Sequence, residues 1–167
     1  MSYNGLVKVI SGGQIGADIA GIRAAKVFGL ETGGWMPKRF MAKDGFHPEY
    51  AEEYGILEHL SAAYPPRTRL NVQHSDGTLR FAYNFNSAGE RCTMYAINQY
   101  SKPYMDIDLK VKRSMQPLAE EVADWIIVNE IATLNVAGNA DKQIEKWIER
   151  FLTRVFNLTC DPEVVPL

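Results

Sequence analysis

Short apolar runs rich in β-branched residues alternate along the chain with segments whose apolar residues recur at helical spacing. The apolar runs predict five strands, at residues 6–10, 31–36, 78–83, 104–108 and 133–137. Helices are predicted at about 17–28 and 65–74, after residue 89, around 118–126 and around 144–156. Residues 40–63 give a mixed pattern. The alternation is typical of an α/β fold of the Rossmann-like, doubly wound type, with a mostly parallel sheet of about five strands and helices on both faces.

Length and composition limit the classes of protein to which the chain can belong. Its 167 residues fit a single domain, 1–167. A net charge of -2 argues against a protein that coats nucleic acid or an anionic membrane. No apolar run approaches the roughly 20 residues of a membrane span, and the first residues lack the basic and apolar regions of a signal peptide. We therefore expect a cytoplasmic protein that binds neither nucleic acid nor membranes.

The residues that most often hold metals are scattered. Cys92 and Cys160 are far apart, and neither belongs to a CxxC motif. His47, His59 and His74 share no ligand spacing with each other or with an acidic residue. We therefore expect no metal site.

The loop after the first predicted strand is the strongest candidate for ligand binding, because ligands of open parallel sheets bind at the carboxyl ends of the strands. It is made of Ser11, Gly12, Gly13, Gln14, Ile15 and Gly16, and a helix begins directly after it. Glycine lets the backbone approach a ligand closely, and a helix N-terminus attracts anions. The loop therefore predicts phosphate binding. The alternative is a tight strand-to-helix connection in which the glycines serve only the geometry of the turn.

Acidic and basic residues near the other loops add candidates. Asp18 lies in the first turn of the helix, where it either complements the helix dipole or faces a sugar hydroxyl or a reacting carbon beside the phosphate. Lys38 follows the second strand and suits an anion, and Arg67 suits bidentate phosphate contact or a solvated surface. The remaining candidates are Asn71, Asp76, Gly77 and Thr78, with Gly89 and Glu90 in the polar loop before the next helix.

These loops together resemble those of the molybdenum carrier family, in the circularly permuted YpsA-like branch of the SLOG superfamily. The matching segments run in order along the chain, and include residues 10–18, 33–38, 44–45, 75–78 and 134–138. The resemblance implies a Rossmann-like fold that binds nucleotides, nucleotide-derived ligands or a phosphate-bearing pterin. The same superfamily includes lonely-guy-type phosphoribohydrolases, which cleave the N-glycosidic bond of nucleoside monophosphates.

Two departures from the family pattern bear on catalysis. The first loop of the family reads Gly-Gly-Gln-Thr-Gly-Val-Asp, whereas this chain has Ile15 in place of the threonine. The fourth loop of relatives carries a Gly-Thr pair before the helix, and this chain has Gly89-Glu90 near that point. Both changes weaken the expectation of catalysis more than that of the fold.

The first functional interpretation is a module that binds a phosphate-bearing nucleotide or a molybdopterin-type cofactor. Gly12, Gly13 and Gly16 would cradle the phosphate, and Lys38 and Arg67 would neutralise it. The alternative is a phosphoribohydrolase in which Asp18, Asp76 or Glu90 stabilises an oxocarbenium-like transition state. A third interpretation is an NADP-dependent oxidoreductase.

The expected assembly is a homodimer. Trp125, Trp147 and the apolar residues 164–167 remain to be buried after the helices have covered the sheet. Apolar surface of that kind often marks an interface, and the twofold dimer is the commonest assembly.

Overall fold

A computed structural model describes residues 2–160. Its main sheet has six strands in the order β5-β2-β1-β8-β6-β7, and all neighbouring strands are parallel. The strands are β1 (Lys8–Ile10), β2 (Glu31–Met36), β5 (Ile56–Glu58), β6 (Gly77–Ala82), β7 (Tyr104–Asp108) and β8 (Thr133–Gly138). A separate antiparallel pair is formed by β3 (Met41–Ala42) and β4 (Gly45–Phe46).

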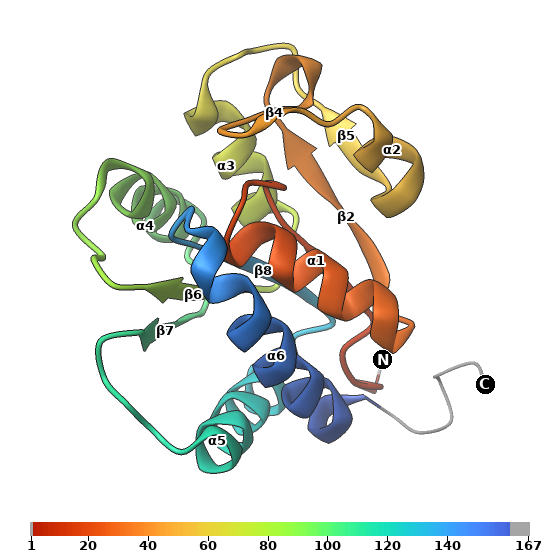
Figure 1. The fold of residues 1–167 in the computed structure, drawn as a ribbon. Helices are drawn as coiled ribbons and strands as arrows, with labels where there is room; N and C mark the ends of the chain where they lie inside the picture. Colours follow the sequence, from red (N-terminus) through yellow and green to blue (C-terminus); the bar gives the residue numbers. More distant parts are fainter. Residues whose placement is uncertain (1, 161–167) are drawn as a thin grey trace.

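Helices cover both faces of the main sheet (Figure 1). They are α1 (Ala17–Phe28), α2 (Glu49–Tyr54), α3 (Tyr64–Gln73), α4 (Ala88–Tyr100), α5 (Met115–Val128) and α6 (Glu145–Thr159). Helices α1, α5 and α6 pack together on one face, and α3 packs beside α4 on the other (Figure 1). Short 3₁₀ turns precede β3 and α6, at Lys38–Phe40 and Lys142–Ile144. The predicted doubly wound α/β fold is confirmed.

The small residues of α1 explain how that helix lies close to the sheet. A Cβ atom at Gly21 would lie 2.7 Å from the Val136 side chain of β8. Ala17, Ala20 and Ala24, which share this face, are all buried. The close approach fixes the loop before α1 against the carboxyl ends of β1 and β8, where ligands of parallel sheets bind.

All five predicted strands lie in the main sheet, and the structure adds a sixth. β5 contains only three residues and pairs with β2 alone, at one edge of the sheet. Two of its residues, Leu57 and Glu58, are exposed. So short a strand carries too few positions for a periodic pattern, which is why the segment 40–63 gave a mixed signal.

The two tryptophans on which the dimer prediction rested pack against the core of their own chain. Trp147 stacks on Phe151, with ring centroids 5.2 Å apart, and Trp125 packs against the same apolar cluster. Residues 164–167 lie outside the described residues. The homodimer stays a prediction. Within residues 2–160, none of the helices combines the length and the hydropathy needed to cross a bilayer.

Candidate functional site

A cavity of about 600 Å³ lies at the carboxyl ends of β1 and β8, on the face of the sheet covered by α3 and α4. Its walls come from the loop before α1, from α3, from the start of α4 and from the loop after β8. Seven of the residues proposed from the sequence line it, namely Gly12, Gln14, Asp18, Arg67, Asn71, Gly89 and Glu90. The structure therefore brings three separate loops of the predicted site together.

Three backbone N–H groups of the first loop, those of Gly13, Gln14 and Gly16, are already bonded within the protein. Gly13 donates to Ser11 Oγ (3.1 Å) and Gln14 donates to Asp18 Oδ2 (3.3 Å). Gly16 donates to Glu145 Oε1 (3.0 Å), at the start of α6. The donors that a phosphate would use in this turn are thus satisfied by side chains of the chain itself. Of the three glycines, only Gly12 lines the cavity.

Gly12 makes room for the guanidinium of Arg67. A Cβ atom at Gly12 would lie 1.4 Å from Arg67 Nη1 and 2.8 Å from Asp18 Oδ2. Arg67 Nη1 lies 3.5 Å from Asp18 Oδ2, so the two charges face each other across the glycine. Arg67 Nε is buried and has no hydrogen-bond partner among the described residues. A buried donor without an acceptor is costly, so this atom is a natural contact for an anionic ligand.

Asp18 is a buried carboxyl group inside this cavity. Burial raises its pKa, while the Arg67 guanidinium and the backbone N–H groups of Gln14 and Gly12 act in the opposite direction. These groups also hold the carboxylate in place beneath the guanidinium. Asp18 therefore orients Arg67 as well as lining the cavity.

The start of α4 forms the opposite wall. Ser87 caps the helix by accepting a hydrogen bond from the Glu90 N–H (3.4 Å). The N–H groups of Ala88 and Gly89, in the first turn, have no protein acceptor among the described residues. No protein atom lies within 4 Å of the position that a Cβ atom of Gly89 would occupy. This helix N-terminus is therefore open to the cavity in a way that the N-terminus of α1 is not.

Glu90 connects the cavity to a buried arginine in the sheet. Arg80 of β6, only 2% exposed, makes a bidentate ion pair with Asp106 of β7 through two contacts of 2.7 Å. Its Nη1 donates to the Glu90 carbonyl (3.0 Å) and lies 3.6 Å from Glu90 Oε2. Glu90 Oε2 itself has no hydrogen-bond partner in the described chain. Burial raises the pKa of Glu90 to about 7, Arg80 opposes the shift, and Asp18 and Asp106 add to it.

Replacing Glu90 with glutamine is expected to flatten the pH dependence of stability. The folded-state pKa of about 7 exceeds the ordinary value of 4.5, so the native state keeps a proton that the unfolded chain releases between these two pH values. The stabilisation is complete below pH 4.5 and is lost as the pH rises through 7, by about 3 kcal/mol in total. Urea denaturation of Glu90→Gln across this range should lack that decline. Glu120→Gln, at an exposed position of α5, should keep it.

Seven of the predicted residues do not line the cavity, namely Ser11, Gly13, Gly16, Lys38, Asp76, Gly77 and Thr78. Lys38 is exposed beyond β2 and does not line it. Asp76 and Gly77 lie at the amino end of β6, at the opposite end of the strands from the cavity. There Asp76 Oδ2 accepts a hydrogen bond from the Thr133 N–H (2.8 Å). Thr78 is buried and accepts a hydrogen bond from Asn135 (3.2 Å). Residues 75–78 precede a strand or begin it, and none of them follows one. This position in the sequence indicates the amino ends of the strands, whereas ligands bind at the carboxyl ends.

Ser11 and Asn71 have structural contacts. The Ser11 hydroxyl donates to the Asp18 carbonyl (3.0 Å) and accepts from Gly13, which holds the turn closed. The Asn71 side chain makes two hydrogen bonds with the backbone of Trp35, at 2.9 and 3.1 Å, and so fixes α3 to β2. Asn71 lines the cavity, but the oxygen and the nitrogen of its amide both already form hydrogen bonds within the protein.

Gly13 is required by the fold rather than by a ligand. Its φ is +67°, and a Cβ atom there would lie 2.6 Å from the sulfur of Met36, which is fully buried. Gly13→Ala is therefore expected to lower the free energy of unfolding by about 2–4 kcal/mol, from backbone strain and overpacking. Gly89→Ala, at an unstrained position with open space, should leave it nearly unchanged. Equal losses in urea denaturation of the two variants would contradict this assignment.

Other cavity residues were not proposed from the sequence. They are Lys43, Tyr64, Pro65, Thr68, Ser87, Ala88, Cys92, Thr93, Asn135, Ala137, Gly138, Asn139, Ala140 and Asp141. Asn139 directly follows β8, so its place after a strand was a usable signal, whereas Asn135 lies inside that strand. Lys43 had none, because it lies in a turn within the mixed segment. Among residues 2–160, no group of three or more His, Cys, Asp or Glu is arranged to hold a metal ion.

The fold agrees with the comparisons with known proteins. The family model described as the circularly permutated YpsA SLOG family matches residues 9–157. A crystal structure described as a putative molybdenum carrier protein from Syntrophus aciditrophicus SB is 32% identical, with a TM-score of 0.79, and the match covers 94% of this chain and 96% of that one. A comparison with curated proteins gave no match. The match runs from β1 into α6, through every segment that lines the cavity, and the chain belongs to the circularly permutated YpsA SLOG family.

Proposed function

We propose that the cavity between α1, α3 and α4 binds a small phosphate-bearing ligand, either a nucleotide or a molybdopterin-type cofactor. The observation that carries the proposal is Arg67, whose side chain lines this cavity and whose buried Nε has no hydrogen-bond acceptor among residues 2–160. A phosphate oxygen would satisfy it, and the planar guanidinium is suited to such a contact. The description of the Syntrophus relative as a molybdenum carrier agrees with a pterin-type ligand.

The phosphate position that we propose lies between Arg67 and the start of α4. The N–H groups of Ala88 and Gly89 are unbonded there, and the missing Cβ of Gly89 leaves space beside them. Two open N–H groups at a helix N-terminus and one arginine are a frequent anion-binding combination. The first loop then contributes through Gly12, which lets Arg67 lie flat against the backbone.

Glu90 and Asp18 define the polar end of the cavity. Glu90 has a pKa of about 7, so near neutral pH its carboxyl group both accepts and donates hydrogen bonds. Ribose hydroxyls and the amino and amide groups of a pterin or purine ring are the partners that such a carboxyl prefers. The ligand that we propose therefore carries a phosphate and further hydrogen-bonding groups.

The phosphoribohydrolase alternative keeps one supporting observation, since Asp18 and Glu90 share this cavity. Asp18 is engaged by Arg67 and by backbone N–H groups, and a carboxylate held in this way suits a stabilising anion better than a proton donor. We expect nucleoside monophosphates to be bound with negligible turnover. The NADP interpretation is less favoured, because Asp18 and Glu145 occupy the N–H groups on which a dinucleotide pyrophosphate would rest.

Comparing phosphorylated with unphosphorylated ligands tests the proposal. Calorimetry with a nucleoside monophosphate, with the matching nucleoside and with molybdopterin should give measurable binding only where a phosphate is present. Mass spectrometry of the small molecules retained by the purified protein identifies the natural ligand. Affinities that do not differ between nucleotide and nucleoside would refute a phosphate site. Release of free base from a nucleoside monophosphate by the native protein, but not by Asp18→Asn, would support the phosphoribohydrolase alternative instead.

A further inference from the structure

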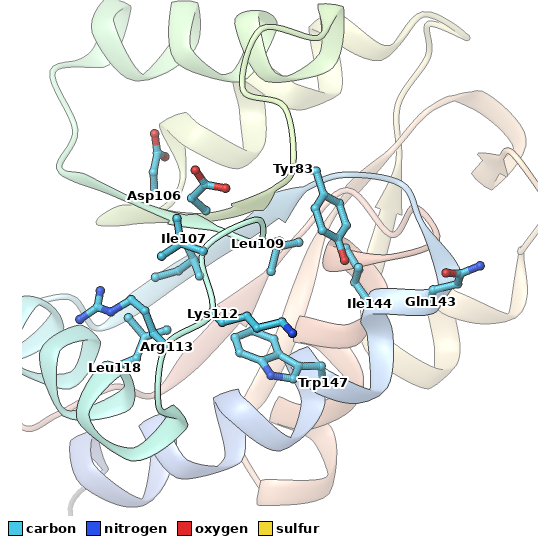
Figure 2. Close-up of a pocket in the computed structure, with 12 residues that line it drawn as sticks. Tyr83, Asp106, Ile107, Leu109, Lys112, Arg113, Leu118, Gln143, Ile144 and Trp147 are labelled. Carbon is cyan, nitrogen blue, oxygen red and sulfur yellow. The ribbon is translucent and has the colours of Figure 1, made fainter.

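A second cavity, of about 620 Å³, lies near the carboxyl end of β7 and is separate from the one described above. Its walls come from β7 and the loop that follows it, from α5 and from the start of α6 (Figure 2). Helices α5 and α6 cover the face of the sheet opposite to α3 and α4. No residue lines both cavities.

The floor of this second cavity is aromatic and rigid. Trp147 is stacked on Phe151, with an interplanar angle of 6°, and Phe81 meets both rings edge-on. Ile107, Leu118 and Ile144, all buried, together with the partly buried Leu109, complete an apolar wall around the indole. A flat surface of this kind suits a planar apolar group of similar size.

The acidic side chains at this cavity are directed away from it. Successive side chains of a strand point to opposite faces, so Ile107 faces the cavity while Asp106 and Asp108 face the other side of the sheet. Figure 2 shows Asp106 pointing away from Trp147, and Asp106 is bound there to Arg80. Asp108 accepts a hydrogen bond from the Lys110 N–H (2.9 Å).

Two donor groups face the cavity without partners. Lys112 and Tyr83 line the cavity together with Trp147, and the hydroxyl end of Tyr83 points toward it in Figure 2. Neither the Lys112 ammonium nor the Tyr83 hydroxyl has a hydrogen bond or an ion pair among the described residues. Arg113, at the rim, is paired with Glu121. Beside an aromatic floor, the cavity thus offers an unpaired cation and an unpaired hydroxyl, together with the Gln143 amide.

We infer that this second cavity binds a small planar organic carboxylate, with its ring on Trp147 and its carboxylate at Lys112 and Tyr83. The charge is complementary, because the unpaired group at the opening is cationic and the carboxylates of β7 face the other side. Trp147 and Lys112 line the same cavity, which therefore offers an aromatic acid both a ring surface and a cation. The inference goes beyond the proposed phosphate site and does not depend on it.

Binding of 2-naphthoate tests the inference, with calorimetry and Trp fluorescence as readouts. We expect saturable binding in the micromolar to millimolar range. Lys112→Gln should weaken it at least tenfold, and Lys110→Gln, an exposed lysine two positions away that does not line the cavity, should not. The neutral 2-naphthamide should bind at least tenfold more weakly than the acid. Tyr83→Phe, which keeps the ring, should weaken binding of the acid several-fold.

The same measurements contain the outcomes that would overturn the inference. They are absence of saturation by 2-naphthoate up to 10 mM, equal loss in Lys110→Gln and Lys112→Gln, or equal affinity for acid and amide. Binding of 2-naphthoate should also survive Arg67→Met, which disables the other cavity. Loss of binding in that variant would place the carboxylate in the cavity of the proposed phosphate site. Failure of the phosphate proposal would leave these results unchanged.

Discussion

Arg80→Leu is expected to lower the free energy of unfolding by about 3–5 kcal/mol at pH 8. The guanidinium is buried in β6 and neutralises Asp106 and Glu90 from the same position. Leucine fills the space without a charge, so the Glu90 carboxylate is left in a buried environment with no compensating cation. Removing one partner of a buried ionic group costs far more than the group contributes as a whole.

The loss should be smaller at pH 5. There Glu90 is protonated in the native protein, because its folded-state pKa is about 7, and the neutral carboxyl needs Arg80 less. In the leucine variant the pKa of Glu90 should rise further, since the stabilising cation is gone. Urea denaturation at the two pH values measures both losses. Equal losses at pH 5 and pH 8 would show that packing, and not charge, accounts for the effect.

Two variants serve as controls for Arg80. Arg113→Leu removes an exposed arginine that is paired with Glu121, and should change the free energy of unfolding by no more than about 1 kcal/mol. Adding Glu90→Gln to Arg80→Leu should recover part of the loss at pH 8, because the unpaired carboxylate is then absent. A double-mutant cycle of these two residues gives their coupling energy.

The sequence predicted the sheet well because long-range packing reinforces its local patterns. β1, β6 and β8 are buried on both faces, and continuous apolar runs are what such strands require. The edge strand β5 was missed because only Ile56 of its three residues is buried. The short helix α2 was missed for a similar reason, with six residues of which only Tyr50 and Tyr54 are buried.

The candidate site was predicted less completely, since its properties depend on contacts between distant segments. The first loop has the composition of a phosphate-binding turn, but Glu145, far along the chain, accepts the hydrogen bond of the Gly16 N–H. Arg80 drew no attention, because a polar residue inside a strand is normally the solvent-facing member of an alternating pattern. Its buried role depends on Asp106 and Glu90, which only the fold brings to it.

Arg67→Met is expected to weaken binding of a nucleoside monophosphate or a molybdopterin by about 10- to 100-fold. A hydrogen bond to a charged group contributes about 1.5–3 kcal/mol, and each 1.4 kcal/mol changes the dissociation constant tenfold. Arg67 lines the cavity beside Gly12, and its buried Nε has no acceptor in the protein. Methionine keeps an unbranched apolar stem and removes all of the donors, so the loss should be confined to ligands that carry a phosphate.

The interpretation of Arg67→Met depends on Asp18, whose carboxylate lies 3.5 Å from the guanidinium. Without that cation the pKa of Asp18 should rise further, so the stability of the variant should fall more with rising pH than that of the native protein. Its ligand affinity is best measured at a pH where the variant remains folded. Arg69→Met, on the exposed side of the same helix, should change neither stability nor affinity. Gly12→Ala gives an independent check, because its Cβ would lie 1.4 Å from Arg67 Nη1 and displace the guanidinium. If Arg67 contacts the phosphate, Arg67→Met and Gly12→Ala should both weaken binding of the nucleotide more than binding of the nucleoside. Equal losses for the two ligands would instead make Arg67 a structural partner of Asp18 alone.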